Sequence, residues 1–238
     1  MTSTFAPLPV RTLARKQTLP EGNMGIFRKA LAEGFDRMHP MMQARFGMHA
    51  GGNIACVGEG EMTEMKTGNL WVKPFLFLGA PEHVLFPEKG KNIPFVIENY
   101  PYRDAQGRES ITFVRTFYFP KHIRRFDAYM SWDEERDCVV DYLGRKQRLV
   151  TDLHMEVDSR GHVIIRSGRL DWVFGKSRLP AWPGGYAEVE EWYDESEDRM
   201  RIRVSIAHPR FGRIYSYEGW FRCTFIQADS VPDHVAAR

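Results

Sequence analysis

From residue 53 to residue 227 the chain is a nearly unbroken series of strand-type segments joined by short polar turns. These segments are rich in Val, Ile, Thr, Tyr, Phe and Trp, which fit a pleated, half-buried surface. Turns at 104–107, 133–137, 158–161 and 194–198 are short enough to join antiparallel neighbours. No helical crossover of ten residues separates the segments, which argues against a parallel sheet. We predict strands near 53–65, 69–78, 93–102, 109–119, 123–132, 137–143, 147–157, 162–174, 185–193, 199–208 and 213–227.

A row of about ten antiparallel strands has two free edges unless the sheet closes or folds on itself. Many of these segments are longer than the usual strand of about five or six residues, and long, coiled strands are what a small barrel needs. We therefore predict a mainly β protein: a single antiparallel, strongly curved sheet or closed barrel of the calycin or lipocalin type. A flat sandwich is the alternative.

The N-terminal part of the chain has a different pattern. Apolar residues recur at helical spacing over 24–46, and His39-Pro40 interrupts the pattern because proline lacks a backbone donor. We expect a helical segment here that covers an open end of the barrel, and no other substantial helix. The predicted organisation is a flexible arm at 1–23, one barrel-like domain at 24–227 and a tail at 228–238.

Composition limits the class of protein and its compartment. The 33 basic residues nearly balance the 31 acidic ones, so no charge excess points to nucleic acid. No apolar run reaches the length of roughly 18 residues that a membrane-spanning helix needs. The 3 cysteines are far apart and odd in number, which does not fit a disulfide framework. We expect a cytoplasmic protein without a membrane span.

A set of short phrases along the chain resembles a known family. The phrases include Phe35-Asp36-Arg37-Met38-His39-Pro40, Ile97-Glu98-Asn99-Tyr100, Thr112-Phe113-Val114-Arg115-Thr116-Phe117, Asp141-Tyr142-Leu143-Gly144, Glu191-Trp192-Tyr193-Asp194 and Pro209-Arg210-Phe211-Gly212. Together, over roughly residues 25 to 227, they resemble a bacterial family of domains of unknown function, family 4166. Its members occur alone, at the C-terminus of YndJ-type proteins, or joined to saccharopine-dehydrogenase-like enzymes. The resemblance implies no activity and no catalytic residues. It does imply a stand-alone copy that works beside a redox or lipid-modifying enzyme.

Strand alternation identifies one arginine of special interest. Arg115 shares its predicted strand face with Ile111, Phe113, Phe117 and Phe119, so its side chain should point into the interior. A buried guanidinium needs a partner. One interpretation is a salt bridge to Asp127 or Asp141 that fixes the strand register. The other is an arginine that holds a carboxylate or phosphate head group inside the barrel.

Other polar residues are candidates for the same site. Tyr129 and Tyr142 are candidates to assist Arg115, and His208 closes a strand with an apolar phase, so it is a candidate at the rim. The candidate ligand-binding residues are therefore Arg115, Asp127, Tyr129, Asp141, Tyr142 and His208. Glu190 and Glu191 diverge on one strand and face Arg201 and Arg203, which predicts an outer charged ladder.

Histidines and cysteines show no metal-ligand spacing, and neither a nucleotide-binding loop nor a nucleophile elbow occurs. We predict no metal and no cofactor. The sequence favours a binding or carrier protein for a hydrophobic, anionic small molecule. One alternative is a barrel-shaped isomerase or cyclase that uses Arg115, Asp127, Tyr142 or His208. The other is an accessory domain that docks on a partner oxidoreductase.

Overall fold

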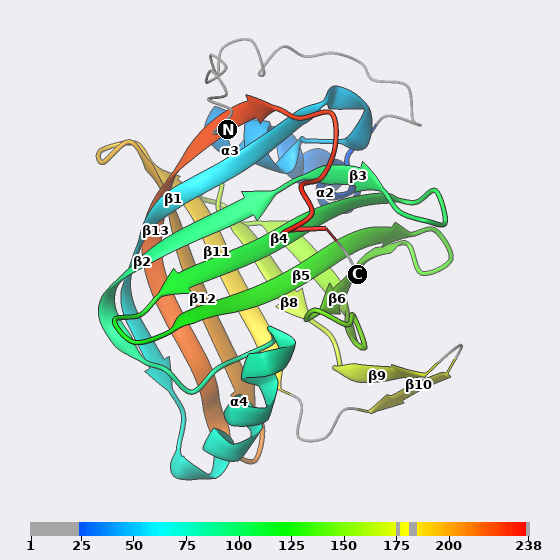
Figure 1. The fold of residues 1–238 in the computed structure, drawn as a ribbon. Coiled ribbons are helices and arrows are strands. Elements are labelled where there is room, and N and C mark those ends of the chain that lie inside the picture. Colours follow the sequence, from blue (N-terminus) through cyan, green and yellow to red (C-terminus); the bar gives the residue numbers. More distant parts are fainter. Residues whose placement is uncertain (1–23, 175–176, 181–184, 237–238) are drawn as a thin grey trace.

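A computed structural model describes residues 24–174, 177–180 and 185–236. In this part of the chain ten strands form a closed antiparallel barrel, in the order β7-β6-β5-β4-β2-β1-β13-β12-β11-β8, with β8 pairing back to β7 (Figure 1). The barrel strands are β1 (Ile54–Thr67), β2 (Gly90–Asn99), β4 (Glu109–Tyr118), β5 (Ile123–Asp133), β6 (Cys138–Leu143), β7 (Leu149–Val157), β8 (Val163–Ser167), β11 (Tyr186–Asp194), β12 (Arg199–His208) and β13 (Gly212–Gln227). The predicted mainly β, closed antiparallel fold is confirmed.

Three short strands lie beside this ring. β3 (Pro101–Arg103) continues the line of β2 and pairs with β4. β9 (Asp171–Phe174) and β10 (Ser177–Pro180) form a hairpin that joins the first residues of β7. Closure through β7 and β8 leaves none of the ten barrel strands with a free edge, so the barrel offers no open ladder for pairing with another chain.

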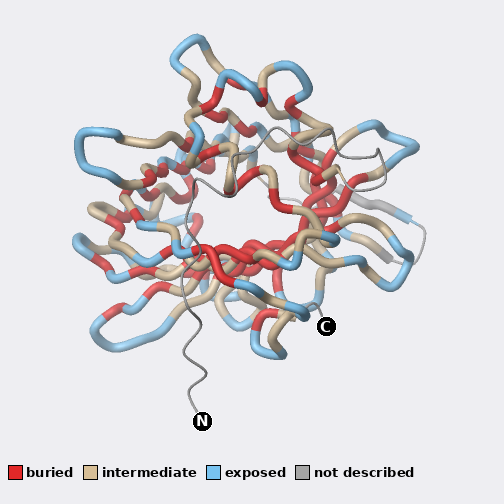
Figure 2. The backbone as a smooth tube through the Cα atoms, turned by 90° about the horizontal axis from the view of Figure 1, so that it is seen from above, coloured by how far each residue is buried: buried red, intermediate tan, exposed pale blue. Residues whose placement is uncertain are grey.

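The interior of the barrel follows the alternation of the strands. On β4, Ile111, Phe113, Arg115 and Phe117 are buried in the core, and so is Phe119 directly after the strand, as the two-residue period requires. Figure 2, seen from above, shows buried residues along the ring of strands and exposed residues at the tips of the turns. The strands bend where glycines allow close approach: a Cβ atom on Gly60 would collide with the backbone of Trp220 and Phe221.

Short helices of the N-terminal segment cover one end of the barrel (Figure 1). They are α2 (Ile26–Leu31), η2 (Ala32–Arg37), α3 (Pro40–Phe46) and η3 (Ala50–Gly52). Phe27 of α2 packs edge-on against Phe46 of α3 and against Phe113 in the barrel, with ring centres 5.1 and 5.6 Å apart. This end of the barrel is therefore filled by side chains. The helix break at His39-Pro40 is as predicted.

At the opposite end of the barrel, the structure has short helices where the sequence predicted a strand. Residues 69–78, predicted as a strand, form η4 (Leu70–Val72) and α4 (Lys73–Gly79), followed by η5 (Ala80–Glu82). Only Val72 and Leu76 of this segment are buried, and a spacing of four residues is helical. Pro74 fits the first turn of the helix, where its missing donor is not needed.

The C-terminal residues pack on the outer face of the sheet. Val235 is fully buried against Ala55, Tyr100, Val114 and Ile226, in a small second apolar cluster outside the barrel. The flexible arm predicted for residues 1–23 lies outside the described residues. Within the described ranges, no helix is long and apolar enough to cross a membrane.

Candidate functional site

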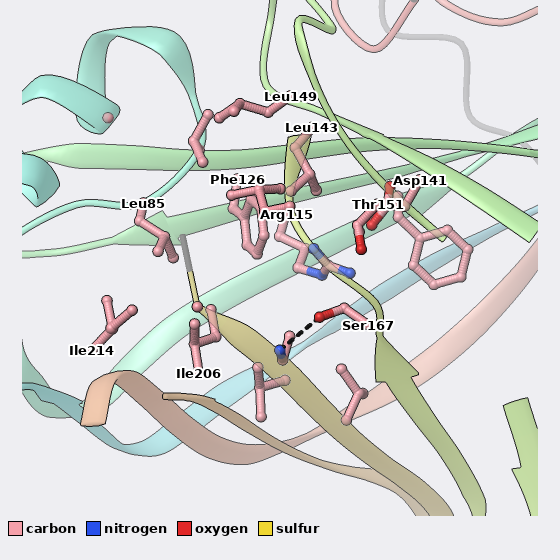
Figure 3. Close-up of a pocket in the computed structure, with 18 of the residues that line it drawn as sticks. Leu85, Arg115, Phe126, Asp141, Leu143, Leu149, Thr151, Ser167, Ile206 and Ile214 are labelled. Atoms are coloured by element: carbon pink, nitrogen blue, oxygen red, sulfur yellow. Dashed lines mark hydrogen bonds between the residues drawn. The ribbon is translucent and has the colours of Figure 1, made fainter. Parts of the chain in front are cut away.

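A cavity of about 330 Å³ lies inside the barrel, beside α4. Most of its walls are aliphatic or aromatic. Figure 3 shows its polar groups gathered on one side, where Arg115, Asp141, Thr151 and Ser167 come from four different strands, while side chains such as Ile206 and Ile214 lie across from them. The cavity therefore has polar groups on the side formed by β4 and β6–β8, and a mainly apolar wall formed by β12 and the first residues of β13.

Arg115 on β4 points into this cavity and is only 6% exposed. Its guanidinium carbon lies 4.8 Å from the centre of the Phe126 ring, a cation–π contact. The Nε atom is buried and has no hydrogen-bond partner among the described residues, and the guanidinium forms no ion pair with any carboxylate among them. The inward direction predicted from alternation is confirmed. The salt bridge to Asp127 or Asp141, one of the two interpretations of this arginine, is not formed among the described residues.

Asp141 on β6 shares the polar wall with Arg115 (Figure 3). It stands opposite Met130 on one side and Thr151 on the other, and both of these line the cavity. Its Oδ1 atom is buried without a hydrogen-bond partner in the described chain. Burial raises the pKa of the Asp141 carboxyl to about 7, against the opposing effect of the Arg115 cation. At neutral pH this carboxyl is therefore partly protonated.

Tyr217 on β13 also lines the cavity, and sequence reasoning missed it. Its hydroxyl is buried and makes no hydrogen bond to a described residue. Burial raises the pKa of this phenol, with Arg115 acting in the opposite direction. Buried polar atoms are nearly always hydrogen-bonded, so the unpartnered atoms of Arg115, Asp141 and Tyr217 around one cavity make it the candidate site.

Three predicted site residues lie on the outer face of the barrel. Directly opposed residues of an antiparallel pair share a face. Arg115 stands opposite Phe126, so the next residue, Asp127, stands opposite Val114 and points outward. Tyr129 and Tyr142 stand opposite each other on the same outer face. These three side chains therefore lie outside the cavity.

These outer residues have other partners. Asp127 accepts hydrogen bonds from Arg125 and lies within hydrogen-bond distance of His83. The Tyr129 hydroxyl donates to the carbonyl of Ala236 at 3.4 Å. The Tyr142 hydroxyl accepts from Nη1 of Arg108 at 3.0 Å. All three contacts serve packing on the outside of the sheet.

His208 is also outside the cavity. It ends β12 at the turn into β13, and its Nδ1 atom accepts a hydrogen bond from the backbone of Arg210 at 3.0 Å. Its ring stacks on Phe211, with ring centres 4.7 Å apart. The imidazole thus stabilises the turn and does not line the cavity.

The deep end of the cavity is closed by an ion pair that the sequence did not predict. Arg45 of α3 is almost fully buried, and its Nη1 atom donates to Glu191 of β11, which lines the cavity. Its Nε atom donates to Oδ1 of Asn99 at 3.1 Å. The guanidinium also lies 5.2 Å from the centre of the Phe113 ring. This pair anchors the N-terminal helices to the barrel interior.

The outer charged ladder predicted for β11 is half correct. Glu190 does pair with Arg203 across the strands, at 2.8 Å. Glu191, however, points inward and is only 2% exposed. The signal was present in the sequence, because Glu191 alternates in phase with Ala187 and Val189, which line the cavity.

Asp158, His162 and Glu190 are the one group of potential metal-ligating side chains found close together in the described residues. The Arg160 guanidinium lies between the two carboxylates, at 2.8 Å from Asp158 and 2.9 Å from Glu190. His162 contacts the same Glu190 oxygen at 2.9 Å. The charges of the cluster are therefore balanced by the protein itself.

Comparisons with known proteins agree with the sequence phrases. The model of the family described as Domain of unknown function (DUF4166) matches residues 38–221. The chain is also similar to the uncharacterized protein YndH of Bacillus subtilis (strain 168), with 32% identity over 200 residues, which cover 83% of this chain and 96% of that protein. The family-model match and this relative together show that the chain belongs to the DUF4166 family.

Proposed function

We propose that this protein binds an apolar small molecule with an anionic head group inside the barrel, as lipocalin-type carriers hold their ligands. The observation that carries the proposal is the Arg115 guanidinium, which is buried on the wall of an apolar cavity and has no carboxylate partner among the described residues. A buried cation of this kind is costly unless an anion meets it. A carboxylate or phosphate head group supplies that anion.

The cavity suits such a molecule in size and lining. Its volume of about 330 Å³ lies within the usual range of roughly 300–1,000 Å³ for small-molecule sites. An apolar tail against the β12–β13 wall gains about 25 cal/mol for each Å² removed from water, before the costs of association. The head group would be fixed by Arg115, with Thr151, Ser167 and the Tyr217 hydroxyl within the same cavity. No disulfide joins the three cysteines in the described chain, which supports a cytoplasmic place of action.

The test compares two ligands with one tail and different heads. Purified parent and Arg115→Met are loaded with fluorescent cis-parinaric acid, which is then displaced by decanoate or by decanol. The parent is expected to prefer decanoate by about tenfold or more, because a charge-assisted contact to the head is lost with the alcohol. Arg115→Met should keep its affinity for decanol and lose the preference.

The control is Arg108→Met, which removes an arginine from the outer face. It should retain the preference of the parent for decanoate. No displacement in the parent, or an unchanged preference in Arg115→Met, would refute the proposal.

A second candidate function is favoured by Asp141. A carboxyl with a pKa of about 7 in an apolar cavity can both give and take a proton near neutral pH. The alternative is therefore an isomerase or cyclase of the same class of molecule, with Asp141 as the proton carrier. Native mass spectrometry of Asp141→Asn and parent, each purified from cells, tests it. Different bound molecules favour the enzyme, and one shared molecule favours the carrier.

A further inference from the structure

Large hydrophobic side chains that face solvent are concentrated at one end of the barrel. Five of them belong to η4 and α4: Leu70, Trp71, Phe75, Phe77 and Leu78. Trp71 is 81% exposed and Leu70 75% exposed. Residues 70–79 contain Lys73 and no acidic residue. The segment is therefore an exposed apolar surface with one positive charge.

The remaining exposed large hydrophobics of the described residues lie at the same end. Tyr118 and Ile123 flank the β4–β5 turn, Trp172 pairs with the first residue of β7, and Tyr186 is the first residue of β11. All of these positions are at the strand ends on the α4 side, because neighbouring strands are antiparallel (Figure 1). We name these nine side chains the apolar rim. Since isolated monomers rarely expose large contiguous apolar patches, such a surface marks an interaction site.

The apolar rim is continuous with the mouth of the cavity. Phe75, Leu78 and Trp172 belong to the rim and also line the cavity. A molecule that leaves or enters the cavity on this side passes directly over the rim. The opposite end is covered by the N-terminal helices and closed by the Arg45–Glu191 pair.

Among the described residues, the unpaired charges around the apolar rim are positive. The carboxylates of this end are paired, for example Glu82 with Lys146 and Glu88 with Arg124. Exposed cations of the same end form no ion pair in the described part of the chain; they include Lys73, Lys121, Arg145, Arg148, Arg210 and Arg213. An anionic surface is the natural counterpart of an apolar patch surrounded by unpaired cations.

We infer that the apolar rim and its surrounding cations dock on the surface of a bilayer that contains anionic phospholipids. Trp71, Phe77 and Leu78 enter the interfacial layer, and the cations contact the head groups. Tryptophan and phenylalanine beside lysine and arginine are the side chains that interfacial segments use. Docking places the cavity mouth against the lipid. The consequence that an apolar ligand exchanges between the bilayer and the cavity rests on the proposed function, whereas docking itself does not.

The experiment measures flotation of the purified chain with vesicles of two parts phosphatidylcholine to one part phosphatidylglycerol. The parent should float with these vesicles and not with vesicles of phosphatidylcholine alone, and added salt should release it. Trp71→Ser/Phe77→Ser should reduce binding by about tenfold or more, because both side chains are exposed and their loss removes apolar contact. Lys73→Glu should also weaken binding.

The matched control for charge is Gln106→Glu, which adds a negative charge in an exposed turn at the opposite end. It should bind like the parent. Failure of the parent to bind, or equal binding by Trp71→Ser/Phe77→Ser, overturns the inference. So does a parent dimer in light scattering that the double variant converts to a monomer, since the rim would then join two copies.

The same variants separate docking from ligand binding. Trp71→Ser/Phe77→Ser should still bind decanoate in the absence of vesicles, because neither side chain lines the cavity. If the parent binds vesicles and no decanoate, the proposed function fails and the docking surface stands. If it binds decanoate and no vesicles, the docking surface fails and the proposed function stands.

Discussion

Nδ1 of His83 lies 2.7 Å from Oδ2 of Asp127, and the backbone amide of Asp127 donates to the His83 carbonyl at 2.9 Å. One residue earlier, the carbonyl of Glu82 accepts from the amide of Arg145 at 2.8 Å. The segment after α4 is thus hydrogen-bonded to both β5 and the residues that follow β6. This double attachment holds α4 at the cavity mouth.

Asp127→Ala should loosen this attachment. The Asp127 carboxylate is buried and shared by His83 and Arg125, so its loss should lower the free energy of unfolding by about 3 kcal/mol. Amide hydrogen exchange should also become faster in residues 80–85 than elsewhere in the barrel. Urea unfolding and exchange mass spectrometry measure the two effects. Glu134→Ala is the control, because Glu134 pairs with Lys29 at the surface and its loss should cost less than about 1 kcal/mol. If amide exchange in residues 80–85 were unchanged, the Asp127 carboxylate would not be what attaches this segment to β5.

Arg45→Met should be strongly destabilising. It leaves the Glu191 carboxylate buried without its partner, and removing one member of a buried ion pair costs about 3–5 kcal/mol. The double variant Arg45→Met/Glu191→Gln should regain part of that loss, because no buried charge remains. Urea unfolding gives the free energy of unfolding of the parent, the single variants and the double variant, which together form a double-mutant cycle. A single variant as stable as the parent would contradict the buried pair.

Asp141 should make stability depend on pH. Its pKa of about 7 in the folded protein lies above the ordinary value of about 3.9 for an unfolded chain. The folded state therefore holds the proton more tightly, and stability falls as pH rises from about 4 to about 7. Relative to Asp141→Asn, the parent should lose up to about 4 kcal/mol over this range. Parallel pH dependence in the two proteins would show that folding does not raise the pKa of Asp141.

The same titration should control ligand affinity. When Asp141 is protonated, the positive charge of Arg115 is not offset, so an anionic head group binds better at low pH. Between about pH 8 and pH 6 the affinity of the parent for decanoate should rise by up to about tenfold. In Asp141→Asn the affinity should be high and nearly constant. Displacement titrations at several pH values test this, with decanol as the uncharged control.

The two-residue alternation of the strands predicted which side chains of β4 point into the barrel. It placed Arg115 inward correctly, and the closed antiparallel barrel followed from the number of strands and the short turns. It failed at residues 69–78, where an almost entirely apolar run carries no alternation and Pro74 alone signals a helix start. The outward direction of Asp127 needed the register of β4 on β5, which the turn between them sets.

Two features of the site depend on residues that are far apart in the sequence and meet only in the fold, so no local sequence pattern predicts them. Arg45 and Glu191 are 146 residues apart in the chain, and nothing in either neighbourhood indicates that they meet. The positive charge around the cavity mouth could not be predicted from the sequence for a similar reason. The net charge of the chain is only +2, but its unpaired cations come from several turns that the barrel brings to one end.

The pairing of the first and last barrel strands has a mechanical consequence. Ile54 stands opposite Gln227, and the β1–β13 ladder continues from there to Thr67 and Tyr215. A force applied at residues 54 and 227 acts on the same end of this antiparallel ladder. It would load the hydrogen bonds one after another, as in a zipper, and not all at once in shear. The barrel should therefore yield to small forces along this axis, even though it has no free edge.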